Sequence, residues 1–351
     1  ILIMTNTKEQ GFHVGIAGTG VYIPSLRMSA AEISAKTNGQ WTEEAIVQKL
    51  GIYEKPVPGI GDGTQEMGVK AAMDCLKNTG IHPEKIDLIL SIGEEWKEFP
   101  LTTTGIYIQE RIGAVNAWAI DLQQRCCTSV AALKIAKDMM FADDDINTVL
   151  IAGGYRNGDF IDYTDSSVSF MFNLAAGAGA ILLQKNLGKN ALLGTHIVTD
   201  GSMARDAGVE FGGTEKPITC ENISEAYCSL RVFDEQHMKA RLNEVSMQNW
   251  MTCIHQAFAK SGLKIADLDY LAALHFKRSL YFGLVEQLGI KPEQTIYLEN
   301  YGHLGQIDQI LSLHLAQQMG KLKEGSVISM IAAGIGYAWG ANVIQWGRCK
   351  V

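Results

Sequence analysis

The sequence predicts a mixed α/β protein built from two similar halves. Apolar runs of strand length alternate along the chain with segments of helical spacing, a pattern typical of sheets with helices packed on their faces. The order of these elements in the first part of the chain recurs in the second, although no repeat is visible letter by letter. We therefore predict one half at residues 1–185 and another at 186–351, with 186–190 as the candidate join.

Composition narrows the class of protein further. The chain has 351 residues, of which 47% are hydrophobic and 19% charged, enough to bury a large core. The formal net charge of −8 argues against a nucleic-acid binder, which would need to neutralise phosphates. No apolar run reaches the length of a membrane span, and the first residues lack the order of a signal peptide. We expect a cytoplasmic protein without a membrane or nucleic-acid partner.

The cysteines indicate free thiols. They are odd in number and lack the CxxC spacing of zinc sites, so we expect neither a metal site nor a disulfide framework. The seven are Cys75, Cys126, Cys127, Cys220, Cys228, Cys253 and Cys349.

The first half alternates short strands with amphipathic helices. Its strands are short apolar runs, and its helices have apolar residues three or four positions apart. We predict strands at 13–17, 86–92, 117–121, 146–153 and 177–184, and helices at 65–77, 102–112 and 129–140.

The second half shows the same alternation of strands and helices, and it begins with a long helix. We predict strands at 268–274, 295–298, 327–332 and 338–344, helices at 235–261 and 306–319, and a further helix that follows the strand at 268–274 and ends at 288.

A cysteine pair marks the start of one predicted helix. Cys126 and Cys127 follow the strand at 117–121 and precede the helix at 129–140, where unpaired helix N–H groups point. A thiolate at such a helix start is stabilised by the helix dipole, which makes it a nucleophile. The alternative is that two small buried residues simply pack a helix against a sheet.

Two histidines, like the cysteine pair, lie between a predicted strand and a predicted helix. His275 follows the strand at 268–274, and His303 lies between the predicted strand at 295–298 and the next helix. Ligands bind at such strand ends in α/β sheets, so the cysteine and both histidines can converge on one pocket.

At this point several motifs together resemble a known family. In order along the chain they are Lys49–Ile52, Glu98–Pro100, Asp121 with Cys126, Phe172 with 176–178, His275, Tyr301–His303 and Gly334–Gly340. In this order they are similar to the type III β-ketoacyl-acyl carrier protein synthases of the thiolase superfamily. The resemblance implies a thiolase fold with five αβαβα layers.

The resemblance also implies ping-pong acyl chemistry. Cys126 would accept an acyl group from a thioester, and a malonyl-type thioester would then lose carbon dioxide and attack it. The backbone N–H groups of Cys126 and Ile335 would form the oxyanion hole, and His275 and His303 would polarise the malonyl carbonyl. The expected substrates are acyl-coenzyme A with malonyl-coenzyme A or malonyl-acyl carrier protein, used in fatty acid or polyketide biosynthesis without a resident cofactor.

Two departures from the family pattern leave the acceptor open. His303 stands where type III enzymes have asparagine, and it resembles the second histidine of the type I and II synthases. A neutral imidazole N–H can donate to an enolate, but a histidine can also act as a base for a hydroxyl, amine or thiol acceptor. Glu94 or Glu95 could match the catalytic glutamate of hydroxymethylglutaryl-coenzyme A synthase, although a solvated acidic loop is the alternative.

Substrate-binding residues also follow from the resemblance. Lys49 matches an arginine that contacts coenzyme A, and Trp41 approximates the tryptophan that stacks on adenine. The arginine on the other side of that stack is replaced by Ser166, and Lys277 and Arg278 are candidate replacements for its phosphate contacts. Phe99 matches a residue that crosses a dimer interface to cap the acyl pocket, so the resemblance implies a homodimer.

The sequence thus predicts an acyltransferase of the 3-oxoacyl-acyl carrier protein synthase III type. The first alternative is a condensation of the hydroxymethylglutaryl type, or acyl transfer to a heteroatom. A non-catalytic partner subunit of a homologous synthase is the second.

Overall fold

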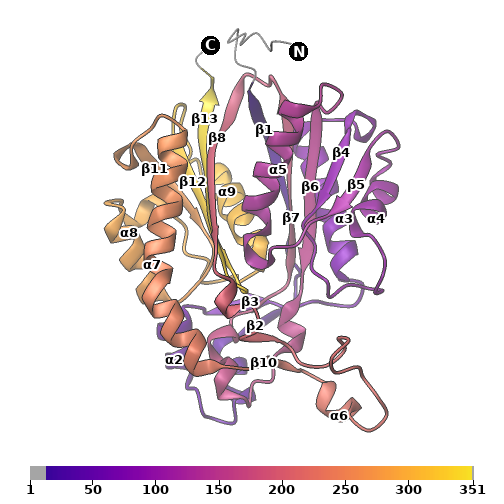
Figure 1. The fold of residues 1–351 in the computed structure, drawn as a ribbon, viewed down its shortest axis with the longest axis vertical. Helices are drawn as coiled ribbons and strands as arrows, with labels where there is room; N and C mark the ends of the chain where they lie inside the picture. Colours follow the sequence, from indigo (N-terminus) through magenta and orange to yellow (C-terminus); the bar gives the residue numbers. More distant parts are fainter. Residues whose placement is uncertain (1–12, 350–351) are drawn as a thin grey trace, which may run out of the picture.

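A nine-stranded mixed sheet runs through the centre of residues 13–349, the part of the chain that this computed structural model describes. Its order is β11-β12-β13-β8-β1-β7-β6-β4-β5 (Figure 1). The strands of this sheet are β1 (Val14–Tyr22), β4 (Leu88–Ser91), β5 (Trp118–Asp121), β6 (Thr148–Tyr155), β7 (Gly177–Lys185), β8 (Lys189–Thr199), β11 (Leu268–Ala273), β12 (Val327–Gly334) and β13 (Ala338–Arg348).

The sheet consists of two groups of strands joined at one place. Strands β5 to β1 come from the first half of the chain, and β11 to β8 come from the second. The two groups meet where β1 pairs with β8 through Gly15 and Ala191. The connection between β7 and β8 therefore carries the chain from one group to the other, within the segment proposed as the join.

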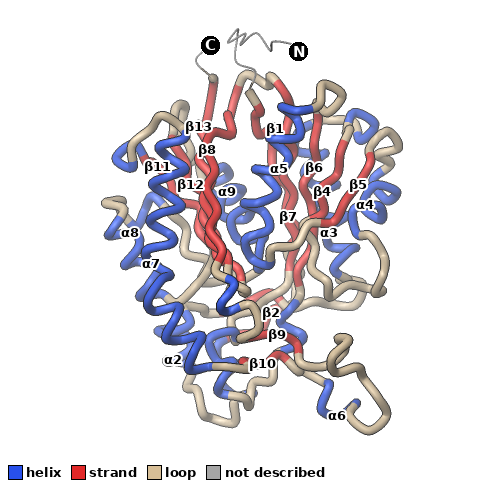
Figure 2. The backbone as a smooth tube through the Cα atoms, in the orientation of Figure 1, coloured by secondary structure: helices blue, strands red, loops and turns tan. Residues whose placement is uncertain are grey.

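Helices cover both outer faces and fill the space between the two groups. Helices α5 and α9 contact strands of both groups and form the middle layer, as Figure 2 shows. Helices α3 and α4 pack on the first group, and α7 packs on β8 and β13. The resulting order is the expected αβαβα. The helices are α1 (Ala30–Lys36), α2 (Glu43–Ala45), α3 (Thr64–Thr79), α4 (Thr104–Ile112), α5 (Thr128–Ala142), α6 (Ile223–Ala226), α7 (Glu235–Lys260), α8 (Arg278–Gln287) and α9 (Asp308–Gln318).

Two small antiparallel sheets of two strands each lie at the end of the molecule where the chain leaves β6 and β12 (Figure 1). One pairs β2 (Arg27–Ser29) with β3 (Glu54–Pro56), and the other pairs β9 (Ala207–Val209) with β10 (Leu230–Val232). A short π-helical turn, Ile46–Leu50, precedes β3. These elements surround the strand ends at which the predicted site residues lie.

Most predicted elements form, but the small elements α1, α2, α6, β2, β3, β9 and β10 were not predicted. The sequence misses β8, because its polar residues, such as Lys189, Asn190 and His196, interrupt the strand pattern. The strand predicted at 295–298 does not form a ladder, since Thr295 makes a single isolated bridge to Leu271. Strand β6 shows why the remaining predictions succeed: all its residues are buried, and its apolar run is typical of a strand covered on both faces.

Candidate active site

Cys126 lies in a tight turn that joins β5 to α5. A 3₁₀ turn, Arg125–Cys127, places its side chain at the N-terminus of α5, where 9% of the residue is exposed. Thr128 closes the turn, because its Oγ1 donates to Arg125 O at 2.6 Å and accepts from Gln124 N at 2.8 Å. Arg125 adopts a φ of 51°, a left-handed conformation that is uncommon for a residue with a side chain. The backbone is thus shaped to present Cys126.

His303 brings its imidazole to the Cys126 sulfur from the second half. Its Nε2 lies 3.1 Å from Sγ, so the two strand-end junctions converge as the sequence predicts. The backbone is anchored across the halves by the bond from His303 N to Asn173 O at 2.9 Å. Gly302 adopts a φ of 66°, and a Cβ there would lie 2.5 Å from Asn173 O, so this turn requires glycine.

Asp308 is a residue of the site that the sequence interpretation missed. It is the first residue of α9, it is fully buried, and its Oδ2 lies 2.5 Å from His303 Nδ1. The same carboxylate accepts the backbone N–H groups of His275 and Leu304, each at 2.7 Å. An aspartate at a predicted helix start, five residues after His303, was the available signal.

The charges of this group favour a protonated imidazole. Burial alone disfavours the imidazolium, but the adjacent Cys126 sulfur and Asp308 carboxylate outweigh burial and raise the pKa of His303 well above its ordinary value. Cys127 behaves differently, since burial raises the pKa of its thiol. Within residues 13–349, Cys126 is the one of the two neighbouring cysteines that contacts an imidazole.

His275 is buried beside this group but is oriented away from the expected role. Its Nε2 lies 3.0 Å from Leu50 O, so it donates there, and its Nδ1 has no partner among the described residues. Burial lowers the pKa of His275 to about 4, which keeps the ring neutral. The structure therefore gives His275 no free N–H for an enolate in this orientation.

Glu94 and Glu95 have different environments. Only 3% of Glu94 is exposed, so the solvated-loop alternative is wrong for it, whereas the Glu95 side chain is 70% exposed. Arg125 bonds both carboxylates, Glu94 at 3.2 Å and Glu95 at 3.0 Å. Burial raises the pKa of Glu94, and the Arg125 charge opposes this effect. An acid/base role remains a prediction for either residue.

The loop after β12 closes the site near Cys126. A Cβ on Gly334 would lie 2.6 Å from Gln124 O and 3.2 Å from Cys126 N, so only glycine permits this approach. Ile335 follows directly, which is compatible with the predicted oxyanion hole. A cavity of about 290 Å³ lies against this loop, lined by residues 123–125, 199–201 and 335–338.

The predicted coenzyme A residues form a separate group near Leu50. Lys49 Nζ lies 5.6 Å from the centre of the Trp41 ring. Arg278 pairs with Glu299 at 2.8 Å and lies over the Tyr297 ring. Lys277 is exposed immediately before α8. The structure thus brings Trp41 and Lys49 together, and the turn that contains Lys49 ends at Leu50, the acceptor of the His275 hydrogen bond.

Comparisons with known proteins converge on one family. The family described as 3-oxoacyl-[acyl-carrier-protein] synthase III matches residues 120–201, and its C-terminal counterpart matches 258–346. β-Ketoacyl-[acyl-carrier-protein] synthase III of Agrobacterium fabrum is 27% identical over 340 residues, covering 94% of this chain and 98% of the relative. The enzyme of Paramagnetospirillum magneticum is 26% identical over 338 residues, with 94% and 98% coverage. The protein is synthase III-like.

Solved structures agree on the thiolase fold of this synthase III-like protein. 3-Oxoacyl-[acyl-carrier-protein] synthase III from Aquifex aeolicus aligns with a TM-score of 0.81 at 23% identity, over 95% of this chain and all of that one. OleA from Xanthomonas campestris, solved with lauric acid and lauroyl-CoA, aligns with a TM-score of 0.80 at 16% identity, over 95% of this chain and 99% of that one. The five-layered thiolase fold predicted from the sequence is confirmed.

In this synthase III-like protein, Phe99 does not belong to the Cys126 site of its own chain. It is 69% exposed, in the loop between β4 and α4, and contributes nothing to the Cys126 group. Its predicted role in a partner's acyl pocket remains a prediction.

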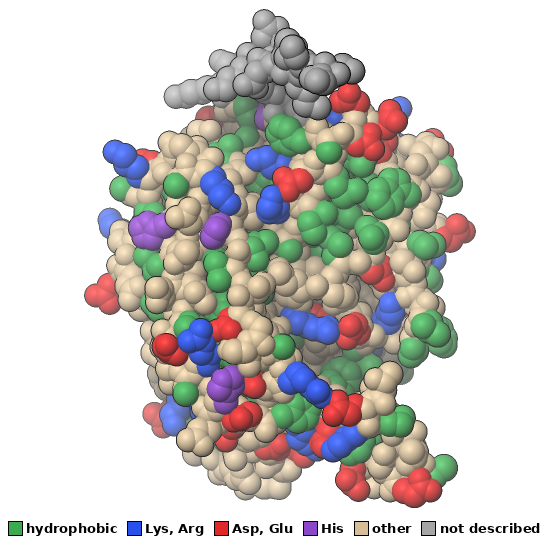
Figure 3. Space-filling model, viewed as in Figure 1, with side chains coloured by type: hydrophobic (Ala, Val, Ile, Leu, Met, Phe, Trp, Pro, Cys, Tyr) green, Lys and Arg blue, Asp and Glu red, His purple; other side chains and the backbone are tan. Residues whose placement is uncertain are grey.

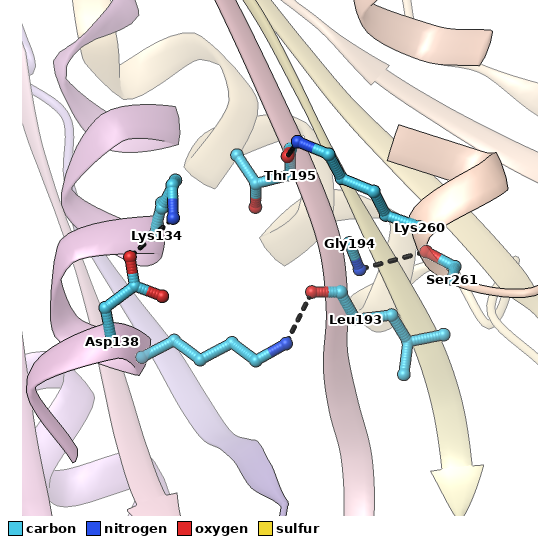
Figure 4. Close-up of a pocket in the computed structure, with 8 residues that line it drawn as sticks. Lys134, Asp138, Leu193, Gly194, Thr195, Lys260 and Ser261 are labelled. Atoms are coloured by element: carbon cyan, nitrogen blue, oxygen red, sulfur yellow. Dashed lines mark hydrogen bonds and ion pairs between the residues drawn. The ribbon is translucent and has the colours of Figure 1, made fainter. Parts of the chain in front are cut away.

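A second cavity of the synthase III-like protein lies between α5, β8 and α7. Its volume is about 340 Å³, and Figure 4 shows lysines from both helices around the β8 backbone. Lys137 donates to Leu193 O and Lys260 to Thr195 O, so both amines are tied to β8. None of the predicted site residues lines this cavity. Around it, acidic and basic side chains are interspersed over the molecular face seen in Figure 3.

No described helix combines the length and apolar character needed to cross a bilayer.

Proposed function

We propose that the protein is an acyltransferase that takes an acyl group from a thioester onto Cys126 and condenses it with a malonyl-type thioester. The observation that carries this proposal is the 3.1 Å contact between the Cys126 sulfur and His303 at the start of a helix. Relatives named synthase III, aligned along 94% of the chain, support this reaction class. The proposed donors are thioesters of coenzyme A or of an acyl carrier protein, and no resident cofactor is required.

In the first step the Cys126 thiolate attacks the acyl carbonyl carbon. A carbon–sulfur bond forms, the donor thiolate leaves, and His303 supplies the proton that this leaving group takes up. The proposed donors to the tetrahedral oxyanion are the backbone N–H groups of Cys126 and Ile335. Donors of this kind contribute about 3 kcal/mol each. Neither donor depends on its side chain, so isoleucine at 335 is compatible with the role.

In the second step the malonyl-type thioester loses carbon dioxide. The electron pair of the broken bond forms an enolate, which attacks the acyl carbon and releases the Cys126 thiolate. The enolate oxygen needs an N–H donor. Because Asp308 accepts from His303 Nδ1, a neutral His303 carries no hydrogen on Nε2. In the proposed mechanism decarboxylation therefore uses the imidazolium form of His303 in place of the neutral imidazole considered from the sequence.

A second candidate function is acyl transfer to a hydroxyl, amine or thiol. The same hydrogen bond to Asp308 favours it, since a neutral His303 presents a lone pair on Nε2. That lone pair can take a proton from an attacking heteroatom. The two candidates require opposite protonation states of His303, so their second steps have opposite pH dependence.

The test separates acyl loading from acyl transfer. The protein is incubated with coenzyme A thioesters of increasing chain length, and intact mass measures loading. Cys126→Ala should abolish loading, whereas the neighbouring Cys127→Ala should retain it, because the Cys127 thiol stays protonated. The loaded enzyme then receives malonyl-coenzyme A or a heteroatom acceptor.

Discharge with release of carbon dioxide supports condensation. Discharge only by a hydroxyl, amine or thiol contradicts condensation and supports the second candidate. If no donor loads the protein, both enzymatic candidates fail and a partner subunit without catalysis is favoured.

A further inference from the structure

We propose that Asp308 is a positioning residue that holds His303 by its Nδ1 and thereby maintains the Cys126 sulfur as a thiolate ready for acylation. The inference deepens the proposed function and rests on acylation of Cys126. It does not depend on which acceptor later discharges the acyl group.

The hydrogen bonds of Asp308 define its role. Its side chain is fully buried, and its oxygens accept from His303 Nδ1, His275 N and Leu304 N at 2.5 to 2.7 Å. All three partners are N–H donors, so the carboxylate acts only as an acceptor. Its position at the first residue of α9 places the negative charge at the positive end of the helix dipole. The carboxylate is thus held in one place by three N–H groups from two segments of the chain.

A carboxylate fixed in this way determines how His303 faces the cysteine. The hydrogen on Nδ1 points to Asp308, and Nε2 points to the sulfur at 3.1 Å. Proton transfer from sulfur to Nε2 produces an imidazolium between two anions, an arrangement that Coulomb attraction stabilises in a buried site. Without the Asp308 charge, only the sulfur would oppose the effect of burial on the imidazolium, so the proton should return to the sulfur more readily.

The other titratable groups around this pair do not replace Asp308. Burial, together with the charge of Cys126, raises the pKa values of Tyr155 and Tyr337, so both stay neutral. His275 is neutral as well. Arg125, which precedes the cysteine, is already bonded to Glu94 and Glu95.

The test is the pH profile of Cys126 alkylation by iodoacetamide, followed by mass mapping of the Cys126 peptide. Asp308→Asn keeps the shape of the side chain and removes its charge. We expect the midpoint of the profile to rise by at least about one pH unit, and acyl loading at pH 7 to fall about tenfold or more. Asp308→Glu, which restores the charge, should recover part of both effects.

A matched control is Asp206→Asn, because Asp206 also bonds a histidine, His237 Nδ1 at 2.8 Å, without contacting His303. It should leave the Cys126 profile unchanged. A folded Asp308→Asn protein with the wild-type profile overturns the proposal. If that variant does not fold, Asp308→Glu decides: a shifted midpoint supports the proposal, and an unshifted midpoint with tenfold slower loading overturns it.

Alkylation needs no acyl donor. Failure of every thioester to load the wild-type protein would therefore refute the proposed function separately, while the alkylation profile still tests Asp308.

Discussion

Lys55 shows how a single buried titratable side chain can make stability depend on pH. Only 1% of the residue is exposed, and its Nζ donates to the carbonyl oxygens of Phe172 and Leu174 at 2.7 and 2.6 Å. A third bond joins it to the Tyr163 hydroxyl at 2.8 Å. These partners carry no charge, and burial lowers the pKa of Lys55 from 10.5 to about 7. Lys55 anchors β3 to the segment that precedes β7.

We predict that Lys55 makes stability depend on pH between about 7 and 10.5. In this window the unfolded chain binds a proton at Lys55 that the folded protein lacks, so the free energy of unfolding rises with pH, by up to about 1.4 kcal/mol per pH unit. Lys55→Met should flatten this slope relative to wild type. Urea unfolding at several pH values measures it, with Lys239→Met, an exposed lysine on α7, as control. Equal slopes in wild type and Lys55→Met would contradict the prediction.

The sequence identifies the proposed reacting residues more readily than the residues that hydrogen-bond to them. Cys126 and His303 could be found because each follows a strand and precedes a helix, where ligands bind. Asp308 could not, because an aspartate at a helix start is usually only a cap or a dipole partner. Glu94 was a candidate, but its burial and its pairing with Arg125 could not be predicted, since Arg125 comes from a turn 31 residues later. Such pairings arise from tertiary packing and leave no local pattern.

At the scale of elements, the turn before α5 and the loop after β12 are fitted to each other. Gly334 approaches the backbone of Gln124, Cys126 and Cys127 so closely that any Cβ would collide. The contact joins the proposed nucleophile, Cys126, in the first half to the proposed oxyanion donor, Ile335, in the second.

Gly334→Ala should therefore impair catalysis more than stability. The added Cβ would displace the loop that carries Ile335, and a misplacement of about 1 Å can cost about 100-fold in rate. Overpacking of this kind typically destabilises by about 1–3 kcal/mol. Acyl loading rates and thermal unfolding measure the two effects.

Gly283→Ala is the control, because its Cβ, on α8, would meet nothing within 4 Å. It should leave loading unchanged. Wild-type loading by a folded Gly334→Ala protein would show that this loop does not position an oxyanion donor.

Elements were predictable where hydrophobic periodicity alone determines them. The long helix α7 and the buried strand β6 form nearly as expected. Strand β8 was missed because it mixes polar and apolar residues. It forms through pairing with β13 and β1, which are distant in the sequence. The 295–298 segment contains residues that favour strands, but it makes only one bridge to β11. Strand propensity without a neighbouring strand to pair with does not produce a strand there.

At the scale of the whole molecule, β5 ends the sheet and exposes apolar side chains. Trp118 and Ile120 are 48% and 42% exposed and lie on one face of the strand. Exposed apolar edge strands are sites of pairing with another chain. This edge is therefore the candidate interface of the homodimer that the family resemblance implies.

We predict that lysines at both positions, Trp118→Lys with Ile120→Lys, convert a dimer into monomers, because two copies would place like charges and hydrated amines at one interface. Light scattering after size-exclusion chromatography gives the mass in solution. Leu280→Lys on α8, which is also about half exposed, is the control and should remain dimeric. A monomeric wild-type protein would refute the homodimer, and a dimeric double variant would refute this edge as its interface.

The thiol and its imidazole come from opposite sides of the sheet junction at Gly15 and Ala191. Because Cys126 belongs to the first half and His303 to the second, the proposed thiol chemistry requires both halves to be folded and packed together. The Cys126–His303 distance therefore depends on how the two strand groups are aligned with each other. Substitutions far from the pocket that slide one strand group past the other should first be detected as slower thiol chemistry, before any loss of secondary structure.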